Sequence, residues 1–291
     1  MELANIYSVL KVFKEDDPKP KFSIINEPHQ ADGMPPREFY VPDIKTKNIS
    51  DFYELPIGLW QGEKIANLRN QESITKSETL EIDWVTPLDV KAFRQGKIKI
   101  NPIVACCITI TKDNQILIPF RGGELSEEGR KLYARGKVGL IPAGGITWKQ
   151  KYLKDPITDA ITQEFTEEIG HFNYEFLGLI GIIESISDLP GIKFISVVKV
   201  NATLRQIQET NVNSINLRNI LNKKGIKSEE IEEELKNKNL PVDAWENSPL
   251  LGIENNSVSI KRILEAQPEI FTAQTIAGLS LYAQKLSRQK S

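Results

Sequence analysis

The chain has 291 residues, of which 40% are hydrophobic and 26% charged, with a net charge of −2 and an isoelectric point near 5.9. These proportions are those of an ordinary globular protein with one large domain, or with a domain and an extension. The near-neutral charge argues against nucleic acid or a membrane surface as the main partner, so a small molecule is expected instead.

Residues 1–95 hold several prolines, polar stretches and a few short apolar runs. We expect an N-terminal extension here, either irregular or folded as a small subdomain with short strands, and its pattern predicts no function. Its first residues carry neither the basic segment nor the long apolar core of a signal peptide. No apolar run in the chain approaches the roughly 20 residues of a membrane span. A cytoplasmic protein without membrane contact is therefore expected.

A hairpin opens the second part of the chain, residues 96–291. The β-rich runs NPIVACCITI and QILIPF flank Lys112–Asn114, a sequence typical of a hairpin turn. The run KVGLIPAGG then predicts a strand that enters a Pro-Gly turn. Cys106 and Cys107 are neighbours on the first strand and point to opposite faces, which argues against a disulfide between them and favours a reducing compartment. No spacing of Cys and His suits zinc.

The stretch DPITDAITQEFTEEIG, residues 155–170, predicts an amphipathic helix. Asp155 suits the N-cap, Pro156 suits the first turn, and Gly170 is a typical stop. Apolar residues recur every four positions from 157 to 169, so one face of the helix is expected to dock on a sheet.

Two strand-like runs, YEFLGLIGIIES and KFISVVKVNA, follow this helix. Residues 204–240 are polar and contain the acidic run SEEIEEELKNK, so we expect a helical insertion with a solvated face. The last residues predict one or two closing helices. Strands and helices in this order predict an α/β fold.

Three glutamates, Glu164, Glu167 and Glu168, lie near the C-terminal end of the predicted helix, within an arc of about 100° beside its apolar stripe. Like charges three or four residues apart each cost a few tenths of a kcal/mol, and the helix dipole is already negative at this end. A surface helix with surplus acid is one interpretation. A divalent cation is the other, because Mg²⁺ takes compact sets of oxygen ligands and completes them with water and substrate phosphates.

Residues 145–171 resemble the box of the Nudix hydrolase superfamily. The family pattern is Gly, five residues, Glu, seven residues, Arg-Glu, an apolar residue, any residue, Glu-Glu, any residue, Gly and an apolar residue. The matching positions are Glu164, Phe165, Glu167, Glu168 and Gly170, and Pro142–Gly145 resembles the Pro-Gly-Gly turn that often opens the box. The order of strands and helices matches over about residues 101–285, apart from the insertion.

Several positions depart from this pattern. Asp155 stands where the first Glu is expected, after a gap of nine residues from Gly145 where the pattern has five. Gln163 replaces the Arg that orients a catalytic glutamate in the family, and it can hydrogen-bond but cannot form an ion pair. His171 stands where an apolar residue is expected, and Phe172 is expected to take over the packing.

The resemblance implies a Nudix-type α/β/α sandwich with a mixed sheet, joined to the N-terminal extension. It implies Mg²⁺-dependent hydrolysis of the diphosphate linkage in a nucleoside diphosphate derivative, with Mn²⁺ as an alternative metal. A sugar nucleotide such as ADP-ribose or a UDP-sugar is the expected substrate. Glu164, Glu167 and Glu168 are the implied catalytic residues and metal ligands, with the carbonyl of Gly145 as a further ligand.

Other candidate residues lie outside the box. Arg121 ends the second strand of the hairpin, where the family often has a basic residue that meets substrate phosphate, and a surface arginine is the alternative. The candidates for stacking on the base are Tyr133, Trp148 and Trp245, for which packing in the core is the alternative. The general base is expected to be a box glutamate or one of Glu184, Glu209 and Glu246.

Two other functions stay open. A Nudix-fold protein that senses a nucleotide without hydrolysing it is favoured by Gln163 and opposed by the retained glutamates. An interaction module in which residues 1–95 bind a partner is the third hypothesis. A homodimer is one expected state of the chain.

Overall fold

The computed structural model describes most of the chain, namely residues 6–14, 16–24, 65–76, 79–122, 134, 136–147, 155–187 and 189–289. In chain order the elements are β1 (Tyr7–Val12), β2 (Phe22–Ile24), β3 (Ile65–Leu68), α1 (Glu72–Lys76), β4 (Leu80–Val85), α2 (Pro87–Arg94), β5 (Ile103–Ile110), β6 (Gln115–Pro119), β7 (Ala143–Gly145), α4 (Pro156–Glu168), β8 (Tyr174–Ser185), β9 (Gly191–Val200), α5 (Leu204–Lys223), α6 (Ser228–Asn237), η4 (Ala244–Asn247), β10 (Leu250–Glu254), α7 (Ser257–Ala266), η5 (Pro268–Ile270) and α8 (Ala273–Arg288).

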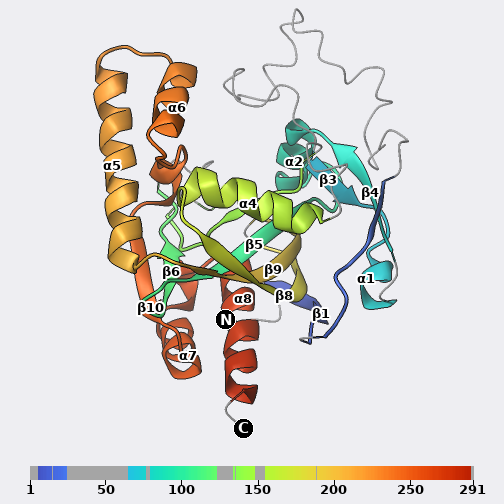
Figure 1. Cartoon of the computed structure of the whole chain (residues 1–291). Coiled ribbons are helices and arrows are strands. Elements are labelled where there is room, and N and C mark those ends of the chain that lie inside the picture. The colour runs from blue at the N-terminus through green and yellow to red at the C-terminus, as the bar shows by residue number, and fades with distance from the viewer. Residues whose placement is uncertain are drawn as a thin grey trace, which may run out of the picture.

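A mixed sheet forms the centre of the fold (Figure 1). Its strands follow the order β1-β8-β9-β5-β6-β10, and β7 also pairs with β5. Strands β5 and β9 run parallel, while the other neighbours run antiparallel. The predicted β5–β6 hairpin is confirmed, and Asn114 in its turn takes a left-handed φ of 59°.

Strand β5 changes its neighbour along its length. Beside β6 its register contains the single pair Ile110–Ile116, at the hairpin turn. Towards its start β5 pairs instead with β7, and Cys106 faces Ala143 there. Strands β6 and β7 therefore pair with β5 at different parts of its length. The candidate site lies where helix α4 ends beside β7.

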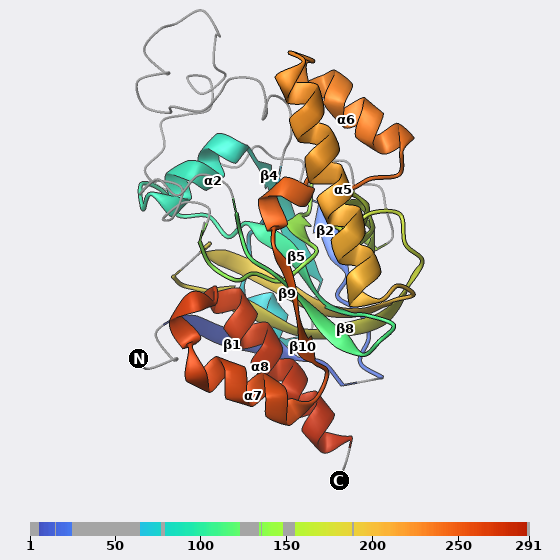
Figure 2. The ribbon, with the colours of Figure 1, turned by 90° about the vertical axis from the view of Figure 1, so that its left-hand side faces the viewer.

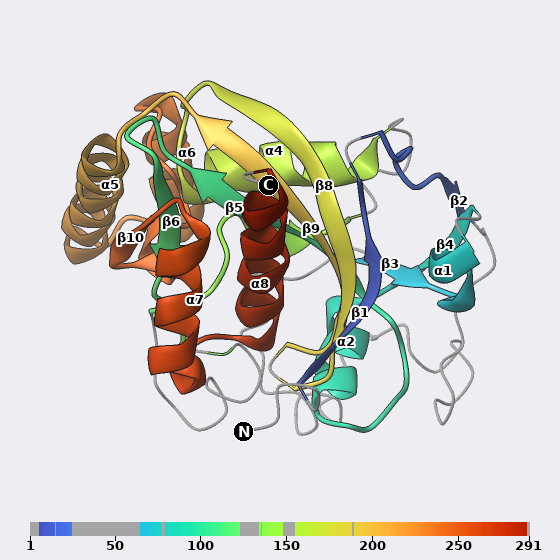
Figure 3. The same ribbon diagram turned by 90° about the horizontal axis from the view of Figure 1, so that it is seen from below.

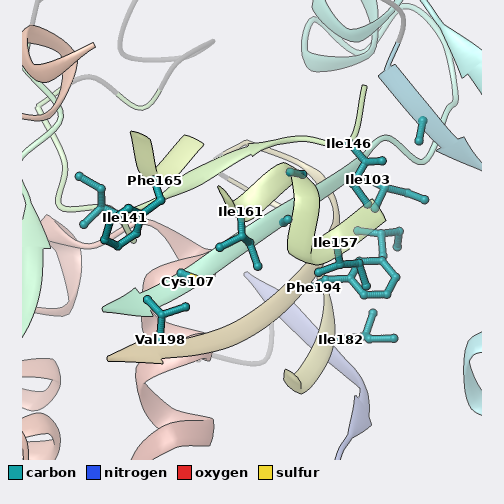
Figure 4. Packing of buried hydrophobic residues seen from close by; sticks show 14 of the residues in the cluster. Ile103, Cys107, Ile141, Ile146, Ile157, Ile161, Phe165, Ile182, Phe194 and Val198 are labelled. Atoms are coloured by element: carbon teal, nitrogen blue, oxygen red, sulfur yellow. The ribbon is translucent and has the colours of Figure 1, made fainter. Parts of the chain in front are cut away.

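Helix α4 covers one face of the sheet. Its side chains Ile157, Ile161 and Phe165 are buried in a cluster with Cys107 and Phe194 from the strands (Figure 4). Burying an aliphatic or aromatic side chain of this size stabilises the fold by about 1.5–3 kcal/mol. The predicted stripe and its docking on a sheet are thus confirmed.

Helices α7 and α8 cover the opposite face of the sheet (Figure 3). Cys106 belongs to the core on this side, whereas Cys107 belongs to the core under α4. Both thiols are free and buried, as expected for neighbours on one strand. The arrangement is an α/β/α sandwich with a mixed sheet, which confirms the predicted fold class.

The N-terminal residues take part in both sheets. Strand β1 pairs with β8 at the edge of the main sheet, whereas β2, β4 and β3 form a smaller sheet. The amide N–H of Ala66 donates to the carbonyl of Ile146 at 2.8 Å, which ties β3 to the residue after β7. The division of the chain after residue 95 stays a prediction.

Residues 204–240, where we predict a helical insertion, contain helices α5 and α6, which stand side by side next to the sheet (Figures 1 and 2). A capping box of Thr203 and Gln206 starts α5. The acidic helix α6 buries only Ile231 and Leu235, against α5 and the segment that follows, and leaves its acidic side chains mostly in solvent. Among the helices that the structure describes, none has the length and hydropathy to cross a membrane.

Candidate active site

Asp155 starts helix α4, whereas Glu164, Glu167 and Glu168 lie near the other end of this helix. Its carboxylate accepts a hydrogen bond from the amide of Thr158 at 3.1 Å, as the predicted N-cap should, and it forms an ion pair with Lys19. It lies nine positions before Glu164, a rise of about 13.5 Å along the helix. The residue at the position of the first box glutamate therefore stabilises the helix, away from the other glutamates.

We expect Asp155→Ala to lower the free energy of unfolding by about 1 kcal/mol, because the first turn of α4 loses its cap. Asp155→Asn is the matched control, since the amide oxygen can still cap the helix and only the exposed ion pair is weakened. Urea unfolding of both variants measures the difference. Equal losses for the two substitutions would assign the stability to the ion pair instead of the cap.

Glu164 and Glu168 lie one helical turn apart at the other end of α4 and face the segment of β7. The carboxyl group of Glu164 occupies the space that a Cβ atom on Gly144 would fill, so a larger residue at this position would displace that carboxyl group. Glu168 is 6% exposed, and its oxygens accept hydrogen bonds from the amide of Ala143 at 3.0 Å and from the side-chain amide of Asn247 at 2.8 Å. The Gly-Gly turn and the box helix are therefore in direct contact.

Two further acids come from the turn η4 and the residue before it: Glu246, which the sequence analysis names as a candidate base, and Asp243, which it missed. The amide of Asp243 donates to the carbonyl of Glu167 at 2.8 Å, and the amide of Gly122 donates to the carbonyl of Glu246 at 2.9 Å. The turn thus links the end of α4 to the end of β6. Asp243 precedes the strand β10 in a short irregular stretch, which has no period that could have marked it.

Helix α5 holds this turn in place. The side chains of Asn211, Ser214 and Arg218 donate to the carbonyls of Ala244, Pro241 and Val242, at 3.2, 2.5 and 2.8 Å. The base of the insertion therefore positions the segment that carries the two additional acids.

Five acids gather at the end of α4, and we call them the acidic cluster: Glu164, Glu167, Glu168, Asp243 and Glu246. Burial and mutual repulsion disfavour the ionised form of several of these carboxyl groups. Burial raises the pKa of Glu164 well above its ordinary value, and the other four acids raise it further. Burial raises the pKa of Glu168 to about 8, against the opposing effects of the Arg121 guanidinium and the Ala143 amide. For Asp243 burial, Glu246 and Glu167 raise the pKa to about 7. For Glu164, Glu168 and Asp243, the effects that disfavour the ionised carboxylate thus outweigh those that favour it.

Arg121 lies beside the cluster at the end of β6. Its backbone pairs with Lys137 and Gly136, and its side chain passes over Gly139, where a Cβ atom would lie 3.4 Å from its Cγ and Cδ. Its guanidinium lowers the pKa of Glu168. The structure therefore brings the predicted phosphate-binding arginine and the box glutamates together.

Gln163, at the position of the family's arginine, donates from its side-chain amide to Glu167 at 3.1 Å. This is a hydrogen bond between neutral and charged groups within one helix, at i, i+4 spacing. Gln163 thus forms a hydrogen bond, of which its side chain is capable, in place of the ion pair that an arginine could form.

The remaining predicted residues are spread more widely. Gly145 ends β7 and lies against Ile65 of β3. Glu184 accepts a hydrogen bond from Gln71, and the exposed Glu209 pairs with Arg205, so of the three candidate bases only Glu246 lies in the acidic cluster. His171 is exposed just after the helix. Trp245 is 39% exposed, and the Arg218 guanidinium lies over its ring. Tyr133 and Trp148 fall outside the described residues.

The acidic cluster suits a divalent cation in donor type and charge. Carboxylate oxygens are the ligands that Mg²⁺ prefers, and a cation would remove the cost of their mutual repulsion. The side-chain oxygen of Asn247 is buried beside Glu168 and has no hydrogen-bond partner among the described residues, which leaves it available as a further oxygen donor. Within the described part of the chain, no three acidic, histidine or cysteine side chains are already gathered closely enough to hold a metal.

No family model matches the chain, and no curated protein matches its sequence. Among solved structures, one match is Tm1382, which is classed provisionally as a Nudix hydrolase. It is 10% identical, and the match covers 48% of this chain and 77% of that one with a TM-score of 0.34. A Nudix hydrolase from Nitrosomonas europaea is 19% identical, with 47% of this chain and 62% of that one covered and a TM-score of 0.24. The match thus spans less than two thirds of the latter protein.

The chain's own features describe the fold better than these distant matches. A glycine-rich turn contacts a glutamate-bearing helix, the helix packs on a mixed sheet, and further helices cover the other face. With the box pattern of residues 145–171 on that turn and helix, the fold of this chain is Nudix-like.

Proposed function

We propose that the protein is a Mg²⁺-dependent hydrolase that cleaves the diphosphate linkage of a nucleoside diphosphate derivative. The observation that supports this most is the acidic cluster, in which burial and mutual repulsion raise the pKa values of Glu164, Glu168 and Asp243. A fold gains nothing from such a cluster unless a cation compensates it. The arginine beside it supplies a partner for the substrate's phosphate.

The chemistry of a diphosphate agrees with this arrangement. Its negative charge repels an incoming nucleophile, so the reaction needs positive charge around the phosphate oxygens. A bound Mg²⁺ would supply that charge and lower the pKa of a water molecule. Glu164 and Glu168 would hold the ion, with Glu167 and the carbonyl of Gly145 as further ligands.

The chain's own groups would have the following parts in the reaction. Arg121 would bind a substrate phosphate through two parallel N–H donors. A carboxylate oxygen of Glu246 would accept a proton from the attacking water. The oxygen of that water forms a bond to one phosphorus while the bond from that phosphorus to the bridging oxygen breaks. The products are two phosphate monoesters.

The N-terminal segment suggests a substrate with a second moiety. Ile65 of β3 lies against Gly145, and the bridge between Ile65 and Thr147 extends this contact past the end of β7. Residues far from the box in sequence therefore border the proposed site. A sugar nucleotide such as ADP-ribose or a UDP-sugar would use this additional wall, whereas a free triphosphate would not.

A panel of nucleotide sugars, dinucleotides and nucleoside triphosphates tests the proposal. The purified protein is incubated with each compound in Mg²⁺, in Mn²⁺ and in a chelator, and the products are separated by chromatography. We expect at least one diphosphate-linked compound to yield two phosphate monoesters, in the presence of the metal only. Intact compounds throughout the panel would refute the assignment as a hydrolase.

We expect Glu246→Gln to lower kcat by about 10²–10⁴-fold, the usual contribution of a general base, with a smaller change in KM. Glu209→Gln is the matched control, because Glu209 pairs with Arg205 on the exposed surface of α5. Glu184→Gln tests the other candidate. Steady-state kinetics across pH compare the three variants, and unchanged kcat for Glu246→Gln would exclude it as the base.

A nucleotide sensor is the second candidate function, and Gln163 favours it. An arginine at this position could form an ion pair with a glutamate of the cluster, whereas Gln163 offers Glu167 a single weaker hydrogen bond. Tight binding of a nucleotide, without product in the panel above, is the result that distinguishes a sensor from an enzyme.

A further inference from the structure

Asn247 is a buried polar residue at the end of the turn η4 and is only 1% exposed. Its side-chain N–H₂ group donates to Oε1 of Glu168 at 2.8 Å, across 79 positions in sequence. The amide of Ala143 donates to the other oxygen of this carboxylate, Oε2, at 3.0 Å. Strand β7 and the turn η4, which lie on opposite sides of α4 in sequence, thus hold the two oxygens of one carboxylate.

The direction of the Asn247 amide is set by this carboxylate. An ionised carboxylate, the form that binds a cation, only accepts hydrogen bonds, so the N–H₂ group of Asn247 has to face Glu168. The side-chain oxygen of Asn247 is buried and has no hydrogen-bond partner among the residues that the structure describes. An unsatisfied buried oxygen is costly to a fold, and a leucine of similar size would avoid that cost. The side chain is therefore better suited to Glu168 than to its other surroundings.

The backbone on either side of Asn247 is held against the end of β6. The carbonyl of Glu246 accepts a hydrogen bond from the amide of Gly122 at 2.9 Å. The carbonyl of Pro249 accepts one from the amide of Phe120 at 3.0 Å. A short side chain on a backbone that is fixed on both sides has few conformations left, so the N–H₂ group of Asn247 has a defined position.

The turn is also tied to the helix that carries Glu168. The amide of Asp243 donates to the carbonyl of Glu167, the residue before Glu168, at 2.8 Å. This hydrogen bond joins the backbone of the helix end to the backbone that leads into Asn247. The position of Asn247 relative to Glu168 is therefore set by backbone contacts as well as by their own hydrogen bond.

The two hydrogen bonds orient the Glu168 carboxylate without blocking it. A carboxylate has about four lone-pair sites, and Ala143 and Asn247 use one site on each oxygen. Each oxygen thus keeps a site that a cation could use. Hydrogen bonds to a ligating carboxylate fix its direction, and their loss typically lowers metal affinity or activity by about 10–100-fold.

We infer that Asn247 is a positioning residue, which acts through Glu168 and sets the direction in which this carboxylate meets a divalent cation. The part of the cation rests on the proposed function, whereas the contact between Asn247 and Glu168 does not. The turn η4 then has a second part in the site, besides carrying the candidate base Glu246. A purely structural role, in which the same hydrogen bond only joins the turn to the helix, predicts lower stability with unchanged affinity for the cation.

Binding of Mn²⁺ to the protein without substrate tests the role of Asn247, with the free ion measured by electron paramagnetic resonance. Asn247→Leu keeps about the size of the side chain and removes its N–H₂ group, so we expect it to bind Mn²⁺ about 10–100-fold more weakly than the wild type. Asn67→Leu is the matched control, because Asn67 is also 1% exposed and donates to a carboxylate, that of Asp83 in the smaller sheet, at 2.7 Å. This control should lower stability and leave the affinity for Mn²⁺ unchanged.

A Glu168→Gln background separates positioning from support of the fold. If Asn247 acts through the Glu168 carboxylate, adding Asn247→Leu to Glu168→Gln should change the remaining affinity for Mn²⁺ by less than about twofold. Asn247→Ser, whose side chain is too short to replace the amide, should also weaken binding and serves if Asn247→Leu does not fold. Wild-type affinity in both Asn247 variants, or an equal loss in both backgrounds, would overturn the positioning role and leave the proposed function standing.

Two other outcomes concern the proposed function. A wild type that binds no Mn²⁺ would refute the metal site, and the role of Asn247 with it. The expected order of affinities, together with no hydrolysis of any compound in the panel, would support the role of Asn247 and refute the hydrolase alone.

Discussion

Replacing Glu168 by Gln is expected to abolish hydrolysis while the protein remains folded. The substitution removes one negative charge from the proposed metal site and keeps the shape of the side chain. Loss of a ligand for the catalytic ion should lower kcat/KM by about 10³-fold or more, which corresponds to about 4 kcal/mol of transition-state stabilisation.

The effect on stability should have the opposite sign. Glu168 is buried with its pKa raised to about 8, so at that pH its carboxylate is costly in the metal-free fold, and the neutral amide is not. Glutamine has only one side-chain oxygen, whereas Ala143 and Asn247 each donate to a separate oxygen of Glu168. One of these two hydrogen bonds must therefore rearrange in the variant. The unpaired oxygen of Asn247 can accept from the new N–H₂ group if the Asn247 amide turns over.

Thermal unfolding and kinetics of the same preparations measure both effects. The melting temperature without metal, near pH 8, should be equal to or above that of the wild type, and added Mg²⁺ should raise it less. Glu175→Gln is a matched control, because Glu175 is exposed on β8 and should change neither quantity. Full hydrolysis by Glu168→Gln would remove Glu168 from the metal site.

The metal-free protein is expected to lose stability as the pH rises from about 5 to about 7. In this range Glu168 and Asp243 keep protons in the fold, since burial raises their pKa values to about 8 and about 7, and Glu164 is shifted in the same direction. In the unfolded chain the same groups are ionised above about pH 4.5. The folded state therefore binds more protons than the unfolded state, and the free energy of unfolding falls by an amount on the order of a few kcal/mol.

Urea unfolding at several pH values, in a chelator and in Mg²⁺, measures this slope. Mg²⁺ should flatten it, because a bound cation favours the ionised carboxylates. The Glu164→Gln/Glu168→Gln double variant should flatten it without any metal. Groups with lowered pKa values, such as Asp113 and Asp155, contribute mainly below this pH range. Stability that stays level or rises from pH 5 to pH 7 without metal would contradict the description of the acidic cluster.

The parts of the fold with a local pattern could be predicted from the sequence. Helix α4 has its cap, its stop and its apolar stripe within 16 residues, so its position and buried face follow from the sequence alone. The β5–β6 hairpin is equally local. The separation of Cys106 from Cys107 follows from the alternation of side chains along a strand.

The parts that depend on distant segments could not be predicted. Asp243 and Asn247 reach the box glutamates only because α5 and α6 return the chain to the end of α4, about 75 residues later in sequence. Strand β1 pairs with β8 across an even longer separation. The burial of Lys193 on β9 could have been predicted in part. Because side chains alternate along a strand, Lys193 lies on the same face as the buried Ile195 and Val197, and this pattern could have marked it as buried.

The contact between helix α5 and the turn η4 divides the insertion into two regions with different tolerance to change. Near its base, the side chains of Asn211 and Arg218 donate hydrogen bonds to the backbone of the turn, so shortening the helical hairpin there would remove support from the acidic cluster. At the tip, Gly225 is exposed and a side chain there would meet nothing within 4 Å. Gly225 has a positive φ of 74° and should stay glycine, so a tag or grafted domain is best inserted beside it, where it would leave the support of the acidic cluster intact.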